Sequence, residues 1–159
     1  MDEILKILSQ DARVSYEDIA KMTGRDVAEV EKAVKEYEES GVIVKYEAVI
    51  NYNLIEQDKP VRALIEVCVT PQEKMGFESV AERIYKFPEV IECYLVSGAY
   101  DLLVVVEGTE DTVANFVASK LSSMENVKST STHFILRKYK EDGYVLKKID
   151  EPNRPNISY

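Results

Sequence analysis

The sequence is poor in the residues that build metal and catalytic centres. Among 159 residues it has one histidine, two cysteines and no tryptophan. Cys68 and Cys93 each lie inside an apolar, strand-like run, so we interpret them as buried thiols that serve as small apolar side chains. Because His133 is alone, no zinc-ligand spacing can be assembled, and we expect neither a metal nor any other cofactor.

Long apolar runs and an excess of positive charge are also missing. No stretch approaches the roughly 18 apolar residues of a membrane span, and the opening MDEILKILSQ matches neither a secretory signal nor a transit peptide. We therefore expect a cytoplasmic protein with no membrane partner. The 29 acidic and 20 basic residues give a net charge of -9, which excludes a generally basic coat for nucleic acid.

Three helical patterns occupy the amino-terminal third. Apolar spacing predicts helices over residues 2–9, 15–22 and 26–39, with apolar stripes that include Met22 in the second helix and Val27 in the third. Ser15 and Asp26 each precede an acidic residue three positions on, which is typical of an N-terminal cap. Gly41 is a suitable left-handed end for the third helix. Residues 42–51 are β-branched and aromatic and predict a strand or a short hairpin.

This order of elements is that of a winged helix-turn-helix, whose recognition helix enters a DNA major groove. We assign it to residues 1–52. The side chains able to flank a groove are Ser15, Tyr16, Lys21, Arg25, Lys32, Lys35 and Lys45. As phosphate contacts they would set register rather than sequence. Two alternatives stay open: the basic residues balance neighbouring acids through i,i+4 pairs, and Ser15 is only a helix cap.

A second domain follows a short linker. Residues 53–60 are polar and acidic and close with Pro60, which predicts the linker. Residues 61–142 then predict strands over 61–70, 90–97, 100–107 and 128–138 and helices over 74–87 and 111–124, which is a ferredoxin-like βαββαβ domain. The fold class is therefore α+β. The remaining residues, 143–159, are predicted to be a tail lying loosely on the surface.

One strand of this domain predicts an interface. Residues 102–106, LLVVV, are apolar at consecutive positions, which is typical of a strand that is buried on both faces. In a ferredoxin-like domain both helices cover the same face of the sheet. A second copy of the domain is the simplest cover for the other face, so we expect a homodimer.

The order winged helix-turn-helix, linker and βαββαβ resembles the Lrp/AsnC family of feast/famine transcriptional regulators. The resemblance extends to about Asp142, and its motifs are Ser40-Gly41-Val42-Ile43, Pro88-Glu89-Val90, Ser97-Gly98-Ala99-Tyr100-Asp101 and Ser129-Thr130-Ser131-Thr132. It implies dimers through the second domain, often assembled into octamers. It also implies a small effector, usually an amino acid, bound where dimers meet around the Gly-x-Tyr-Asp loop.

The resemblance and the residue types together predict an effector site at Gly98, Ala99, Tyr100, Asp101, Thr130 and Thr132. Asp101 would bind the ammonium group, and the two threonines, on one face of the last strand, would offer hydroxyls to the carboxylate. An alternative role remains for Asp101, and another for the two threonines. Asp101 can be a turn aspartate that bonds its own backbone, and ordinary β-propensity accounts equally for the threonines. We interpret His133 as structural.

The recognition helix departs from the family pattern in its charge. Residues 26–39 contain six acids and two lysines, and Glu31-Lys32-Ala33 stands where family members typically carry adjacent arginines. The bidentate guanine contact of an arginine is therefore missing there, and we expect weak DNA affinity.

The favoured function is a transcriptional regulator of the Lrp/AsnC type that binds DNA and responds to a small effector, and we predict no catalytic residues. The alternative is a sensing or scaffolding module of the same architecture whose DNA contact is largely lost. An enzyme similar to the sirohaem decarboxylases is a distant third, because acid/base work on a tetrapyrrole requires clustered histidine and arginine.

Overall fold

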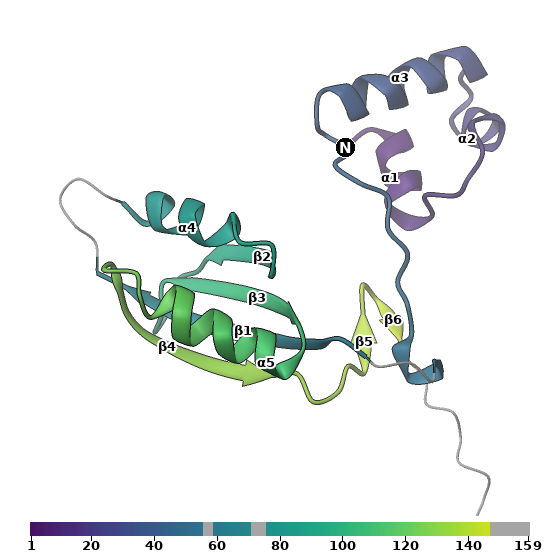
Figure 1. Ribbon diagram of the computed structural model, residues 1–159. Helices are drawn as coiled ribbons and strands as arrows, with labels where there is room; N and C mark the ends of the chain where they lie inside the picture. Colours follow the sequence, from purple (N-terminus) through teal and green to yellow (C-terminus); the bar gives the residue numbers. More distant parts are fainter. Residues whose placement is uncertain (56–58, 71–75, 147–159) are drawn as a thin grey trace, which may run out of the picture. The chain divides into compact units, whose positions relative to one another are not determined.

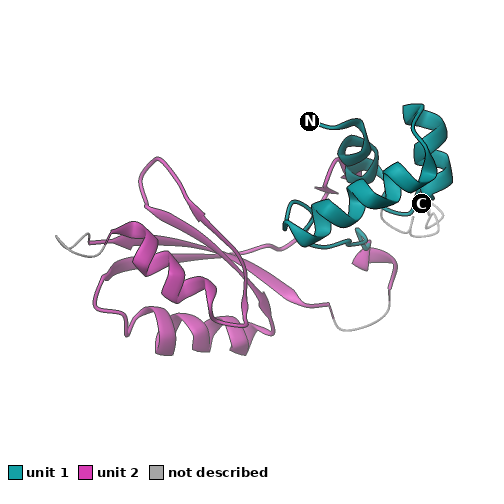
Figure 2. Cartoon of the chain, turned by 90° about the horizontal axis from the view of Figure 1, so that it is seen from above, with its two compact units in different colours: residues 1–50 teal, residues 51–159 magenta. Residues whose placement is uncertain are grey.

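The computed structural model describes residues 1–55, 59–70 and 76–146. It divides the chain into two compact units, residues 1–50 and 51–159 (Figure 2). Part of the predicted linker, the start of the predicted helix over 74–87 and most of the predicted tail lie outside the described residues. Within the described ranges, every helix is too short or too polar to cross a membrane.

The first unit is a bundle of three helices, α1 (Glu3–Gln10), α2 (Tyr16–Thr23) and α3 (Val27–Glu39) (Figure 1). All three predicted helices are confirmed. Their shared core is small, and its fully buried side chains include Ile4 of α1, Ile19 of α2 and Val30 of α3. Gly24 ends α2 with φ +68, a left-handed conformation that costs glycine little. A tight turn of three residues then leads into α3.

Details of these helices differ from the prediction. The Ser15 cap is confirmed, since its Oγ accepts the Asp18 N–H at 3.1 Å. Asp26 occupies the N-cap position of α3 as predicted, but its side chain makes no cap hydrogen bond, and the first turn of α3 is exposed. Met22 and Val27 are 65% and 40% exposed instead of buried. Three short helices have too little surface to cover side chains at helix ends.

The predicted strand or hairpin over residues 42–51 is also wrong. These residues form no strand in the described structure, and five of their apolar side chains are exposed: Val42, Val44, Tyr46, Val49 and Ile50. β-propensity reflects packing on a pleated surface beside another strand. Here the sequence has the propensity, but no strand among the described residues pairs with the segment.

The second unit contains a four-stranded antiparallel sheet in the order β2-β3-β1-β4. The strands are β1 (Val61–Val69), β2 (Val90–Leu95), β3 (Leu102–Gly108) and β4 (Val127–Phe134). Helix α4 (Phe77–Tyr85) and helix α5 (Glu110–Asn115), which continues as a π-helical turn (Phe116–Leu121), cover one face of it (Figures 1 and 2). The predicted ferredoxin-like βαββαβ fold is confirmed.

The predicted end of the last strand and the predicted start of the tail were both wrong. The strand expected over 128–138 ends at Phe134, and a separate hairpin of β5 (Lys140–Glu141) and β6 (Tyr144–Val145) follows it. The start of the predicted tail is therefore paired rather than loose. Asp142 and Gly143, both with positive φ, form the turn of this hairpin.

Alternation along the strands separates two faces of the sheet. Ala63, Ile65 and Val67 of β1 are fully buried under the helices, and they pair with Val106, Val104 and Leu102 of β3. The residues between them therefore point to the other side, which we call the open face. The two cysteines are on opposite faces and only half-buried. Cys93 packs against the helix-side core, and burial raises the pKa of its thiol.

Candidate DNA-binding and effector-binding sites

The four lysines predicted to flank a DNA groove each face a carboxylate. Lys21 Nζ lies 2.9 Å from Asp18, Lys32 and Lys35 each lie 3.9 Å from the glutamate four residues on, and Lys45 pairs with Glu47. The pairing alternative is therefore present in the structure. All four lysine side chains are about two-thirds or more exposed. Such surface pairs contribute about 0–1 kcal/mol, so a phosphate can displace the carboxylate.

The exposed surface of α3 carries more acid than base. Val30 and Val34 face the core, and the outward side chains are Glu29, Glu31, Lys32, Lys35, Glu36, Glu38 and Glu39. Near the start of α2, Tyr16 is 38% exposed, whereas the Ser15 hydroxyl is used within the chain, as a cap and as a donor to Asp18 at 2.8 Å. A duplex approaching this surface would meet a predominantly negative helix.

Arg25 differs from the lysines. Its guanidinium lies in the turn between α2 and α3 and donates to both oxygens of Asp2, with N–O distances of 3.2–3.4 Å. The side chains of Arg25 and Asp2 are 36% and 24% exposed, much less than the lysine pairs. We predicted that Arg25 contacts a DNA phosphate, and in the structure Asp2 competes with a phosphate for its guanidinium.

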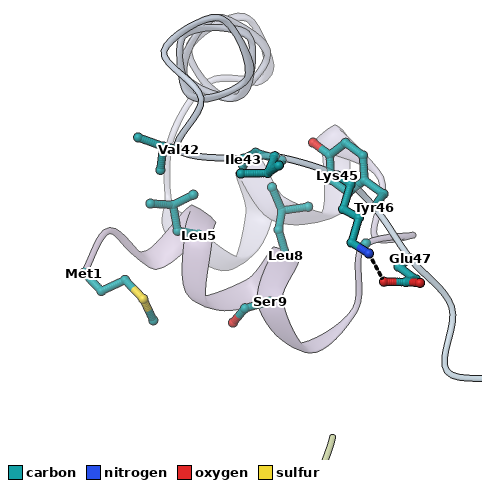
Figure 3. A pocket seen from close by; sticks show the side chains of 11 residues that line it. Met1, Leu5, Leu8, Ser9, Val42, Ile43, Lys45, Tyr46 and Glu47 are labelled. Atoms are coloured by element: carbon teal, nitrogen blue, oxygen red, sulfur yellow. Dashed lines mark ion pairs between the residues drawn. The ribbon is translucent and has the colours of Figure 1, made fainter. Parts of the chain in front are cut away.

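An apolar groove in the first unit was not predicted. It encloses about 480 Å³ between α1 and the extended segment after α3, and its lining includes Leu5, Leu8, Val42 and Ile43 (Figure 3). The same β-branched and aromatic residues after α3 that predicted a strand or a short hairpin supply one side of this groove.

The predicted effector loop is fastened to the end of β1. Asp101 N–H donates to the Val67 carbonyl at 3.1 Å, and Asp101 Oδ2 accepts the Val69 N–H at 2.7 Å. The Cys68 thiol lies 3.8 Å from the Ala99 carbonyl as a weak donor. The Asp101 side chain therefore bonds a backbone group, as the turn-aspartate alternative requires. That group belongs to the neighbouring strand β1 and not to the turn itself.

The two predicted threonines reach β1 from the other side. Thr130 pairs with Val67 and Thr132 with Ile65, so both are half-buried on the helix-covered face. The structure brings Thr130 and Asp101 to the same residue of β1. Thr132 lies two residues farther along, about 7 Å by strand geometry.

The open face has an aliphatic centre and charged edges. Leu64, Leu103 and Val105 lie at the centre, and Val105 is only 3% exposed. Around them Arg62 pairs with Glu107 at 2.9 Å, and His133 lies 3.4 Å from Glu66. Leu103 and Val105 occupy the same face, as strand alternation requires.

Comparisons with known proteins agree with this architecture. Residues 3–44 match the family described as winged helix-turn-helix DNA-binding, and residues 62–145 match the Lrp/AsnC ligand binding domain. The second match alone spans more than half of the chain. The chain belongs to the Lrp/AsnC family. Its relatives are transcriptional regulators rather than enzymes, so it is a DNA-binding transcriptional regulator.

Several relatives of this regulator cover nearly its whole length. The HTH-type transcriptional regulator YugG of Bacillus subtilis is 46% identical over 98% of this chain and 95% of its own. LysM of Saccharolobus solfataricus is 33% identical over 85% of this chain and 90% of its own.

Solved structures of the family share the fold at low sequence identity. LrpA of Mycobacterium tuberculosis has a TM-score of 0.71 at 22% identity, covering 92% of this chain and all of its own. A regulator of Neisseria meningitidis solved as an L-Met complex has a TM-score of 0.67 at 21% identity, covering 89% of this chain and 93% of its own.

Proposed function

We propose that this regulator changes its DNA binding in response to an amino acid that binds at Gly98–Asp101, with Thr130 and Thr132 contributing hydroxyls. The observation that carries the proposal is the attachment of Asp101: Oδ2 accepts the Val69 N–H, which holds the carboxylate in a fixed position and leaves Oδ1 to accept an ammonium group. The L-Met complex of the Neisseria relative supports the choice of ligand class.

Asp101→Asn tests the site with little disturbance of the fold, because the amide oxygen can still accept the Val69 N–H. Loss of the charge should lower amino-acid affinity by about 1.5–3 kcal/mol, roughly 10- to 150-fold. Isothermal titration of wild type and variant with a panel of amino acids measures this loss. A purely structural Asp101 gives unchanged affinity together with a lower melting temperature, and that result would refute the assignment.

We also propose that the regulator forms a homodimer through the open face. The dimers would assemble further, for example into an octamer. The protein would act in the cytoplasm, where its DNA is. The support for the dimer is the half-buried Leu64 and Leu103, which lie beside the buried Val105 at the centre of a sheet face that the helices leave uncovered. An effector that contacts two dimers would favour their association and thereby couple ligand to DNA binding.

A sensing or scaffolding role with weak DNA contact is the second candidate. The acidic outer surface of α3 favours it, because a phosphate backbone would be repelled there. Titration with duplex DNA distinguishes the two roles, since only the regulator should bind with effector-dependent affinity.

A further inference from the structure

The carboxylate of Asp2 joins all three elements of the helix-turn-helix. Oδ1 accepts the Ile4 N–H at 3.0 Å, which caps α1. Oδ2 accepts the Tyr37 hydroxyl of α3 at 2.8 Å, and Arg25, in the turn that follows α2, reaches both oxygens. Three segments separated by up to 35 residues thus meet at one side chain.

The core holds the middle and the last turn of α3 but not its first turn. The fully buried side chains, Val30 and Val34, are one turn apart, and Ala33 and Tyr37 pack partly buried beside them, whereas the side chains of residues 27–29 are exposed. The helix has thirteen residues and is about 20 Å long. Arg25 lies just before the first turn of this helix, and Tyr37 lies in its last turn. Because both bond to Asp2, the carboxylate holds both ends of α3 against the start of α1.

The charge state of Asp2 suits this role. The Ile4 N–H and then the Tyr37 hydroxyl lower the pKa of the carboxyl, and the Asp2 carboxylate raises the pKa of the Tyr37 phenol. Near neutral pH the carboxylate is therefore ionised and the phenol keeps the proton that it donates. The forked, two-oxygen contact of Arg25 also fixes an angle, which a lysine cannot do.

We propose that Asp2 is a positioning residue for DNA recognition, which together with Arg25 and Tyr37 sets the orientation of α3, and that Arg25 acts inside the protein rather than on a DNA phosphate. The proposal rests on the DNA-binding function of the family. It changes the role predicted for Arg25 from phosphate contact to support of the recognition helix.

The test compares two duplexes, one enriched from a random-sequence pool by wild type and one of scrambled sequence. The variants are Asp2→Asn, Arg25→Gln and Tyr37→Phe, each titrated over a range of salt at a temperature where circular dichroism shows it fully folded. Asparagine is as good a helix cap as aspartate, so Asp2→Asn keeps α1 intact. Lys86→Gln is the matched control, because Lys86 is an exposed base of α4 in the second unit whose acidic partner, Glu82, lies one turn away; it should leave both affinities unchanged.

Each of the three variants should bind the enriched duplex roughly tenfold more weakly, the size expected for coupled hydrogen-bonded residues. Affinity for the scrambled duplex and the salt slope should not change. The double variant Asp2→Asn with Arg25→Gln should be no weaker than either single variant. Arg25→Lys should bind the enriched duplex as weakly as Arg25→Gln, because lysine keeps the positive charge but cannot make the two-oxygen contact with Asp2.

Four results would overturn the proposal. A salt slope reduced by about 0.9 in Arg25→Gln would make Arg25 a phosphate contact. Tighter binding of both duplexes by Asp2→Asn would mean that Asp2 competes with DNA for Arg25. Unchanged affinities with lower melting temperatures would leave only a structural role. If wild type enriched no duplex from the pool, the DNA-binding function would fail first, and the role of the three residues with it.

Discussion

Contacts between residues far apart in sequence decide what several charged side chains do. Asp101, Arg25 and Asp2 each look like isolated surface residues in the sequence, yet each bonds a segment more than 20 residues away. The roles that the sequence predicted for Arg25 and Asp101 rested on residue type and on neighbours along the chain. Such reasoning finds caps like Ser15 but cannot find a partner brought near by folding.

Glu89 provides a test of a partly buried ion pair. Its Oε1 lies 2.5 Å from Lys120 Nζ, which also lies 4.8 Å from the centre of the Phe87 ring. The Lys120 ammonium lowers the pKa of the Glu89 carboxyl below its ordinary 4.5. The stabilisation is therefore complete above about pH 4.5 and is lost as the pH falls through the lower pKa of the folded state.

Glu89→Gln should thus lower the free energy of unfolding at pH 7 by about 1–2 kcal/mol, between the values for exposed and buried pairs. Near pH 3 the difference from wild type should shrink. Urea unfolding at both pH values measures it. Glu82→Gln is the control, because its pair with Lys86 is more than half exposed; both its loss of stability and the pH dependence of that loss should be smaller than those of Glu89→Gln. An equal loss for Glu89→Gln at both pH values would contradict the account.

Among whole elements, the helices of the first unit and the first three strands of the sheet were easier to predict than the segment after α3, the end of β4 and the faces of the sheet. A helix is specified by its own periodicity and caps, and α1, α2 and α3 were found to within one or two residues. A strand needs a partner, and the described residues offer none to the β-branched segment after α3, which therefore forms no strand despite its composition. Alternation in β4 placed Thr130 and Thr132 on one face, but only the register with Val67 and Ile65 shows that this face is the helix-covered one.

A substitution on the open face of the sheet tests the proposed dimer interface. Leu103→Lys should dissociate the proposed dimer, because an unpaired charge would be buried in the interface at a cost of several kcal/mol. Leu103 is only half-buried in the single chain, so the fold itself should tolerate the change. Multi-angle light scattering of the full chain checks the mass.

Leu95→Lys is the control for this experiment. Leu95 pairs with Leu102 on the other face of the sheet and is 63% exposed, so its variant should keep the mass of wild type. A dimer that persists in Leu103→Lys, or a monomeric wild type, would exclude the open face as the interface.

Substitutions on the outer surface of α3 test whether its negative charge weakens DNA binding. Glu31→Arg should tighten binding of any duplex several-fold and steepen its salt dependence, because Glu31 is exposed on the outer surface of the helix. Glu31→Gln should have a smaller effect in the same direction. Fluorescence anisotropy with a scrambled duplex measures both. Unchanged affinity in both variants would mean that this surface does not face DNA.

The whole chain combines a helix-turn-helix of the DNA-binding type with a domain of the Lrp/AsnC ligand-binding type. Both the order of the two parts and the ferredoxin-like topology were predictable, because repeated βαβ patterning and apolar runs specify them locally. The acidic recognition helix was also evident in the sequence. The support of that helix by Asp2 was not, because it depends on three distant side chains meeting in the folded unit.

The most direct measurement for the whole account is a titration of the full chain with the DNA upstream of its own coding sequence, at low and moderate salt, with and without a panel of amino acids. We predict weak affinity and a shallow salt slope, because the outer surface of α3 carries more acid than base, and a shift in affinity with at least one amino acid. Nanomolar affinity with a slope near 10 would refute the charge argument. Binding that no amino acid alters would contradict the effector-responsive function.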